Sequence, residues 1–232
     1  MFDVLGTLLE LEPPWPTLRA ILARRHRIDV PEPAVREAML AEMAYYRSNH
    51  QDGRDEASLA DLRRRCALVV RERMPATEAL SLEELTEAML DSIRFTPFPD
   101  AASTLAELRE AGLRLAAVSN WDCSLRSVLA EVGLAGALDA VVVSAEVGAG
   151  KPDPAVFEAA LEAIRCGSEE SLFIGDSLET DVAGAASAGI RALLLDRSAD
   201  GETGADGDDI ERIFSLADLP ELVRRRPGRL VG

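Results

Sequence analysis

Short apolar runs alternate with helical patterns from about residue 96 onward. Runs typical of buried strands lie at residues 113–118, 139–143, 171–175 and 191–195, and helical patterns begin at Asp100, Asp122, Pro154 and Thr180. A closing helix is expected at 216–224, after a Gly- and Asp-rich loop at 196–209. Alternation of this kind builds a parallel sheet with helices on both faces. The pattern therefore predicts an α/β fold with a doubly wound, Rossmann-like sheet.

The segment from about residue 13 to 95 has a different periodicity. Its apolar residues recur at helical spacing, as in Leu18, Ile21 and Leu22. Breaks at 29–33, 51–54 and 74–75 separate roughly four helices. We therefore expect a helical domain over residues 13–95, inserted into an α/β core made of residues 1–12 and 96–232.

Composition narrows the classes of function. The chain has 232 residues, 47% of them hydrophobic, and a formal net charge of -16. Binding to nucleic acid or to an anionic membrane needs clustered positive charge, so neither is expected. The 3 cysteines lack the paired spacing of a zinc site or a disulfide framework, and no segment has the pattern of a signal peptide or a membrane span. We expect a cytoplasmic protein.

Polar residues stand where the predicted strands end. Asp3 follows the apolar start of the chain, Ser119 and Asn120 follow the run at 113–118, and Asp176 follows the run at 171–175. The carboxyl ends of parallel strands open into one crevice where ligands bind, so these residues should converge. Lys151, the only lysine of the chain, lies in a loop before the helix at Pro154. Its Gly-Ala-Gly-Lys context is not a nucleotide P-loop, because Pro152 stands where Ser or Thr is required.

Together, these segments resemble the motifs of the haloacid dehalogenase-like hydrolase superfamily. The first motif of its phosphatases reads Asp-x-Asp-Gly-Thr, and residues 3–7 here read Asp-Val-Leu-Gly-Thr. The resemblance implies that Asp3 is a nucleophile that forms an aspartyl-phosphate. It implies phosphate binding by Thr7, Ser119, Asn120 and Lys151, and a helical cap at residues 13–95.

The same resemblance implies a Mg²⁺ site. Mg²⁺ prefers oxygen ligands, which would be a carboxylate oxygen of Asp3, the backbone carbonyl of Leu5, and Asp176. Asp181 would act through a water or by orienting Lys151. The expected substrate is a small phosphorylated metabolite. Dimers are common in this superfamily, although no feature of the sequence demonstrates one.

Leu5 departs from the motif. It replaces the aspartate that protonates the leaving group and activates water, a contribution of about 10²- to 10⁴-fold. Three functions stay open: a phosphatase that is slow or selective for good leaving groups, a 2-haloacid dehalogenase, and a phosphate- or metabolite-binding protein without turnover. Glu10, Glu12, His26 and His50 could replace the acid, but none has diagnostic spacing.

The start of the chain raises one further expectation. Only Met1 and Phe2 precede Asp3, whereas a strand usually has about five residues. We therefore expect either an unusually short central strand or a natural chain that begins further upstream.

Overall fold

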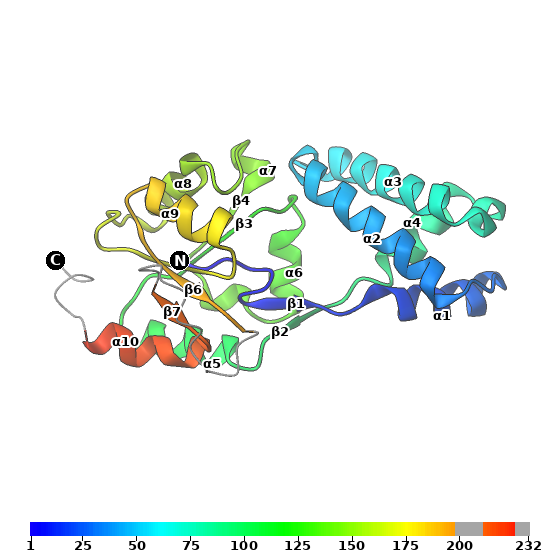
Figure 1. The fold of residues 1–232 in the computed structure, drawn as a ribbon. Coiled ribbons are helices and arrows are strands. Elements are labelled where there is room, and N and C mark those ends of the chain that lie inside the picture. Colours follow the sequence, from blue (N-terminus) through cyan, green and yellow to red (C-terminus); the bar gives the residue numbers. More distant parts are fainter. Residues whose placement is uncertain (198–210, 226–232) are drawn as a thin grey trace. The chain divides into compact units, whose positions relative to one another are not determined.

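The computed structural model describes residues 1–197 and 211–225 (Figure 1). The expected loop at 196–209 lies outside the described residues after Arg197. The chain divides into two compact units. An α/β unit combines Met1–Glu10 with the described residues from Pro97 onward, and a helical unit comprises Leu11–Thr96.

A parallel sheet forms the centre of the α/β unit. Its strands are β3 (Ala116–Ser119), β4 (Ala140–Val143), β5 (Leu172–Gly175), β6 (Arg191–Leu195) and β7 (Arg212–Ile213). β3 pairs with β4, β6 pairs with both β5 and β7, and all three pairings are parallel. Phe2 joins the two halves of the sheet, because it bridges Ala117 on one side and Ile174 on the other. The order is therefore β4, β3, Phe2, β5, β6 and β7, with Asp3 directly after the central position.

Helices cover both faces of this sheet. They are α5 (Ala101–Glu110), α6 (Leu125–Glu131), α7 (Ser144–Val147), α8 (Pro154–Ile164), α9 (Ala183–Ser187) and α10 (Leu219–Arg225). α8 and α9 lie on one face, and α5 and α10 lie on the other (Figure 1). The alternating pattern of the sequence thus corresponds to a parallel α/β architecture.

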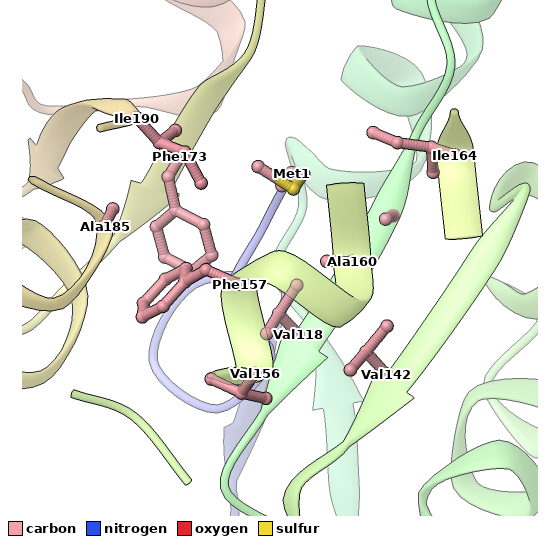
Figure 2. Close-up of a cluster of buried hydrophobic side chains, with 11 residues drawn as sticks. Met1, Val118, Val142, Val156, Phe157, Ala160, Ile164, Phe173, Ala185 and Ile190 are labelled. Atoms are coloured by element: carbon pink, nitrogen blue, oxygen red, sulfur yellow. The ribbon is translucent and has the colours of Figure 1, made fainter. Parts of the chain in front are cut away.

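One hydrophobic cluster fixes α8 against the strands (Figure 2). Phe157 of α8 meets Phe173 of β5 edge to face, with 5.0 Å between ring centroids, and both side chains are fully buried. Val118 and Val142 extend the cluster over β3 and β4. Aromatic pairs of this geometry add about 0.5–1.5 kcal/mol beyond the area they bury. The cluster holds the strands whose ends carry the polar residues.

The helical unit contains α1 (Pro14–His26), α2 (Glu32–Asn49), α3 (Glu56–Arg73) and α4 (Leu82–Leu90). The helix starts follow ordinary capping rules. Asp55 and Ser58 form a capping box at α3, Ser81 and Glu84 form one at α4, and proline stands in the first turn of α1 and α2. None of the helices in the described ranges is long and apolar enough to cross a membrane.

Several local elements differ from the expectation, and the short α7 and β7 given above are among those not expected. β1 (Leu9–Leu11) and β2 (Phe95–Pro97) form a separate two-stranded sheet that the apolar pattern does not indicate. The helix expected from Thr180 begins instead with a π-helical turn, Leu178–Val182, and α9 starts at Ala183. Side-chain periodicity does not indicate the pairing of β1 with β2, because these strands are more than 80 positions apart, and the π-helical turn is made by local bonds from the Asp181 and Val182 N–H groups to the Ser177 carbonyl.

Candidate active site

The expected strand-end residues lie at one edge of the sheet. Asp3 donates its backbone N–H to the Ile174 carbonyl, at 2.8 Å, which places it beside the end of β5. Ser119 ends β3 and is 2% exposed. Asp176 immediately follows β5 and is exposed. The parallel topology therefore brings together residues that are more than 100 positions apart in the sequence.

Lys151 lies buried between two aspartates. Its Nζ donates to Asp3 Oδ1 and to Asp181 Oδ1, the latter at 2.6 Å. The Lys151 and Asp181 side chains are only 3% and 2% exposed, and that of Asp3 is 8% exposed. The ammonium also lies 5.4 Å from the centroid of the Phe173 ring. A buried charge requires a partner, and this lysine has two.

Two glycines leave space for the aspartates. A Cβ on Gly6, whose φ is +92°, would lie 2.2 Å from Asp176 Oδ2. A Cβ on Gly175 would lie 2.4 Å from the Asp181 carboxyl carbon. The Asp181 carboxylate also accepts the Ser177 backbone N–H at 3.1 Å, within the π-helical turn. Glycine at positions 6 and 175 is therefore a condition for the carboxylates to approach one another.

Asn120 is bonded to the lysine loop. Its Nδ2 donates to the Lys151 carbonyl at 2.8 Å, and its Oδ1 accepts the Lys151 backbone N–H at 2.7 Å. Each end of the amide thus bonds the backbone of Lys151. These contacts tie the segment after β3 to the lysine loop, and phosphate binding by Asn120 stays a prediction.

The acidic residues form a candidate metal site. One carboxylate oxygen each from Asp3, Asp176 and Asp181 lies within 4.8 Å of the others. Oxygen donors of this type suit Mg²⁺, which usually keeps several waters and takes only a few carboxylates from the protein. The donor set therefore fits the metal that the motifs imply.

The pKa values of the cluster are shifted by burial and by the excess of carboxylates over ammonium groups. Burial raises the pKa of Asp3 to about 7, Lys151 opposes the rise, and the Asp181 carboxylate adds to it. Burial alone would lower the pKa of Lys151, but Asp3 and Asp181 raise it above its ordinary value. Burial and then Asp181 raise the pKa of Asp176. One ammonium between several carboxylates leaves excess negative charge, which a proton or a cation would balance.

Thr7 lies in the loop that follows Asp3 and is fully buried. Its Oγ1 has no hydrogen-bond partner within the described residues. Its backbone carbonyl accepts a hydrogen bond from Arg197 Nη2 at 2.7 Å. No local motif marks Arg197, because its partners Thr7 and Asp100 lie 190 and 97 positions away in the chain.

Leu5 brings no carboxylate to the site and is 38% exposed. Of the candidate replacement acids, Glu10 is exposed in the α/β unit, whereas Glu12, His26 and His50 belong to the helical unit. His50 is buried there, and its Nδ1 lies 2.9 Å from the Arg47 carbonyl. Of the four candidates, only Glu10 therefore belongs to the unit that carries Asp3.

Two features are typical of a class of hydrolases with a Rossmann-like core: an aspartate directly after the central position of a parallel sheet, and a lysine from a distant loop bonded to that aspartate. The chain belongs to the haloacid dehalogenase-like hydrolase family, whose model matches residues 1–189. This match covers the aspartates, the lysine and the helical unit, and it confirms the resemblance drawn from the motifs.

Individual relatives include both phosphatases and dehalogenases. A phosphoserine phosphatase of Thermus thermophilus is 44% identical over 116 residues, which are 49% of this chain and 47% of that protein. A HAD phosphatase structure from Thermococcus onnurineus is 28% identical with a TM-score of 0.63, over 96% of this chain and 95% of the other. A 2-haloacid dehalogenase structure from Pseudomonas syringae is 25% identical with a TM-score of 0.65, over 97% and 96%. This chain spans about half the length of the curated relatives it matches.

Proposed function

We propose that the protein is a Mg²⁺-dependent phosphatase that acts on a small phosphorylated metabolite through an aspartyl-phosphate at Asp3. The observation that carries this proposal is the acidic cluster of Asp3, Asp176 and Asp181 around the buried Lys151 ammonium. The phosphatase relatives support the same substrate class. The net charge of -16 favours a small-molecule substrate over nucleic acid. Cys66, Cys123 and Cys166 form no disulfide within the described residues, which suits the reducing cytoplasm as a location.

In the proposed first step, an Asp3 carboxylate oxygen attacks phosphorus. A carboxylate–phosphorus bond forms, the bond from phosphorus to the leaving oxygen breaks, and its electron pair departs with that oxygen. Lys151 keeps Asp3 oriented and places a positive charge beside the phosphoryl oxygens, where positioning and charge stabilisation supply most of the catalysis. Ser119 and the unpartnered Thr7 hydroxyl are available to donate to these oxygens.

Mg²⁺, held by Asp3, Asp176 and the Leu5 carbonyl, would neutralise phosphoryl charge. Asp181 already bonds Lys151 through Oδ1 and the Ser177 N–H through Oδ2. Its proposed role is therefore to hold Lys151 and to contribute negative charge to the metal site. The side-chain amide of Asn120 would hold the Lys151 loop through its two hydrogen bonds with the Lys151 backbone.

Leu5 limits both halves of the proposed reaction. Its side chain cannot give a proton to the leaving oxygen, so substrates with stable leaving groups should react fastest. It also cannot take a proton from the water that attacks the phosphoenzyme. For a substrate whose leaving group is stable without a proton, we therefore propose that the aspartyl-phosphate forms faster than it is hydrolysed.

A second candidate function is hydrolytic dehalogenation. Two observations favour it: the apolar Leu5, since halide departs without a proton, and the 25% identical dehalogenase structure from Pseudomonas syringae. The exposed Asp176 beside Gly6 argues against it, because a third carboxylate has no use in displacing halide from carbon. Phosphate transfer is therefore the leading proposal.

The test is time-resolved release of p-nitrophenol from p-nitrophenyl phosphate, with Mg²⁺ or with EDTA. We expect a Mg²⁺-dependent burst followed by slow turnover, absent in Asp3→Asn. The exposed Asp218→Asn, in the same unit, is the matched control and should behave as the parent protein. Halide release from a 2-haloacid without metal would support dehalogenation instead. Mg²⁺ and phosphate binding without any burst or halide release would indicate a protein that binds without turnover.

A further inference from the structure

Arg197 connects the Asp3 loop to the rest of the α/β unit. It lies two residues beyond the end of β6 and is half-buried. Its guanidinium donates to Asp100 with both ends, Nη1 to Oδ2 at 3.2 Å and Nη2 to Oδ1 at 3.0 Å. The same Nη2 donates to the Thr7 carbonyl at 2.7 Å. A single side chain thus joins segments from opposite ends of the sequence.

Further contacts fix the guanidinium in place. Its Cζ lies 3.8 Å from the centroid of the Phe98 ring, in cation–π contact. Asp100 Oδ2 also accepts the Ser215 hydroxyl at 2.8 Å and the Leu216 backbone N–H at 2.9 Å. The arginine therefore cannot swing away from Thr7 without breaking a bidentate pair that other groups orient.

The loop that Arg197 contacts is also held by backbone hydrogen bonds of its own. The backbone N–H groups of Thr7, Leu8 and Leu9 all point to the Val4 carbonyl, at 3.3, 2.8 and 2.8 Å. Gly6 has a positive φ of 92° and contacts Asp176. The Thr7 carbonyl accepts the hydrogen bond from Arg197 Nη2. The loop is thus held both by the Val4 carbonyl and by Arg197.

We propose that Arg197 is a positioning residue for the Asp3 site: through the Thr7 carbonyl, it holds the loop in which Asp3, the Leu5 carbonyl and the buried Thr7 hydroxyl keep their places. This inference rests on the proposed function for its catalytic consequence. Arg197 itself touches neither the nucleophile nor the phosphoryl group. A shift of about 1 Å in a positioned group can lower a rate by about 10²-fold, so the effect should be measurable.

The alternative is that Arg197 only stabilises the fold. The two possibilities separate in burst kinetics, because the burst amplitude counts the folded sites and the burst rate constant reports their geometry. Loss of stability alone lowers the amplitude. Loss of positioning lowers the rate constant in the sites that remain folded.

The experiment compares Arg197→Gln with Arg126→Gln. Arg126 makes a similar two-point contact with a carboxylate, that of Glu146, in the same unit, but it is 53% exposed and does not touch the Asp3 loop. We expect the burst rate constant to fall about 10- to 100-fold in Arg197→Gln and to stay within about twofold of the parent value in Arg126→Gln. A rate constant within about twofold of the parent in Arg197→Gln would overturn the proposal, whatever the amplitude.

Two further arms keep the test decisive. If Arg197→Gln does not fold, Asp100→Asn replaces it, because this change keeps the contact between Arg197 and Thr7 but weakens the ion pair that orients Arg197. We then expect a smaller fall in the burst rate constant. An unchanged burst rate constant refutes the proposal. If the parent protein gives no burst, the proposed function fails by itself. Amide hydrogen exchange of residues 4–9 then decides the positioning role: faster exchange in the Arg197 or Asp100 variant but not in Arg126→Gln supports it, and equal exchange overturns it.

Discussion

Replacing Lys151 with methionine tests the charge balance on which the site depends. The change keeps a long, unbranched side chain and removes the ammonium that bonds Asp3 Oδ1 and Asp181 Oδ1. Both carboxylates are less than a tenth exposed, so solvent cannot replace the lost partner. The variant leaves buried negative charge without a counter-charge.

The magnitude follows from the distances. At an effective dielectric constant of about 20, unit charges about 4 Å apart attract by about 4 kcal/mol, and Lys151 faces two carboxylates. Part of this attraction is offset by the hydration that the buried ammonium gives up. Breaking a buried pair by removing one partner typically lowers the free energy of unfolding by about 3–5 kcal/mol. We expect a loss of this size in the α/β unit, which corresponds to a fall of about 6–20 °C in its Tm.

The assay is urea unfolding and calorimetry at pH 8 in EDTA, with Arg126→Met as the control. Arg126 forms an exposed ion pair, so its loss should lower the free energy of unfolding by less than about 1 kcal/mol. Adding Asp181→Asn to Lys151→Met should restore part of the stability, because it removes one uncompensated carboxylate. A loss below about 1 kcal/mol for Lys151→Met, or strictly additive effects in the double variant, would refute the idea that Lys151 neutralises a buried acidic pair.

The pH dependence of the parent protein gives an independent check on the same cluster. The pKa of Asp3 is raised from 3.8 to about 7 in the folded chain. Between these two values, the folded chain binds a proton that the unfolded chain has released. The contribution of Asp3 to stability is therefore fully present below pH 4, approximately, and is lost as the pH rises through about 7. In metal-free buffer, we expect Asp3→Asn to flatten this part of the stability profile.

Three other substitutions test separate parts of the structure. Leu5→Asp should raise steady-state turnover, most for alkyl phosphates, because a carboxylate can protonate the leaving oxygen and position 5 is 38% exposed; no gain would mean that Leu5 serves another chemistry. Gly6→Ala should lower the free energy of unfolding by about 1–3 kcal/mol and weaken Mg²⁺ binding in calorimetry, because a Cβ at φ +92° would lie 2.2 Å from the Asp176 carboxylate. An unchanged Mg²⁺ affinity would show that Asp176 does not belong to the metal site. Burial raises the pKa of Glu42, and a hydrogen bond with Cys66 opposes the rise, so the contribution of Glu42 to stability falls as the pH increases above 4.5. Glu42→Gln should therefore stabilise the helical unit at pH 8 but not at pH 4. Equal effects at the two pH values would contradict a raised pKa for Glu42.

Several features could be predicted from the sequence because they depend on neighbours in the chain. The strand at 191–195 and the proline that opens α8 stand where the local pattern predicts them. The helix breaks at 29–33, 51–54 and 74–75 fall close to the ends of α1, α2 and α3. Periodicity, glycine, proline and capping residues act over a few positions, so a single sequence displays them directly. The convergence of Asp3, Ser119 and Asp176 was predictable for a related reason, since parallel topology places strand ends at one edge.

Other features were decided only by the tertiary structure. The fold brings the Lys151 backbone to both ends of the Asn120 amide, a contact across 31 positions that no local pattern indicates. Arg197 carries no motif, and its contacts with Thr7 and Asp100 span 190 and 97 positions. The sequence by itself determined most of the core strands and helices and which residues stand at the strand ends. Only tertiary packing decided which side chains those residues meet, because hydrogen bonds and ion pairs depend on distances of a few ångströms between segments that no local pattern relates.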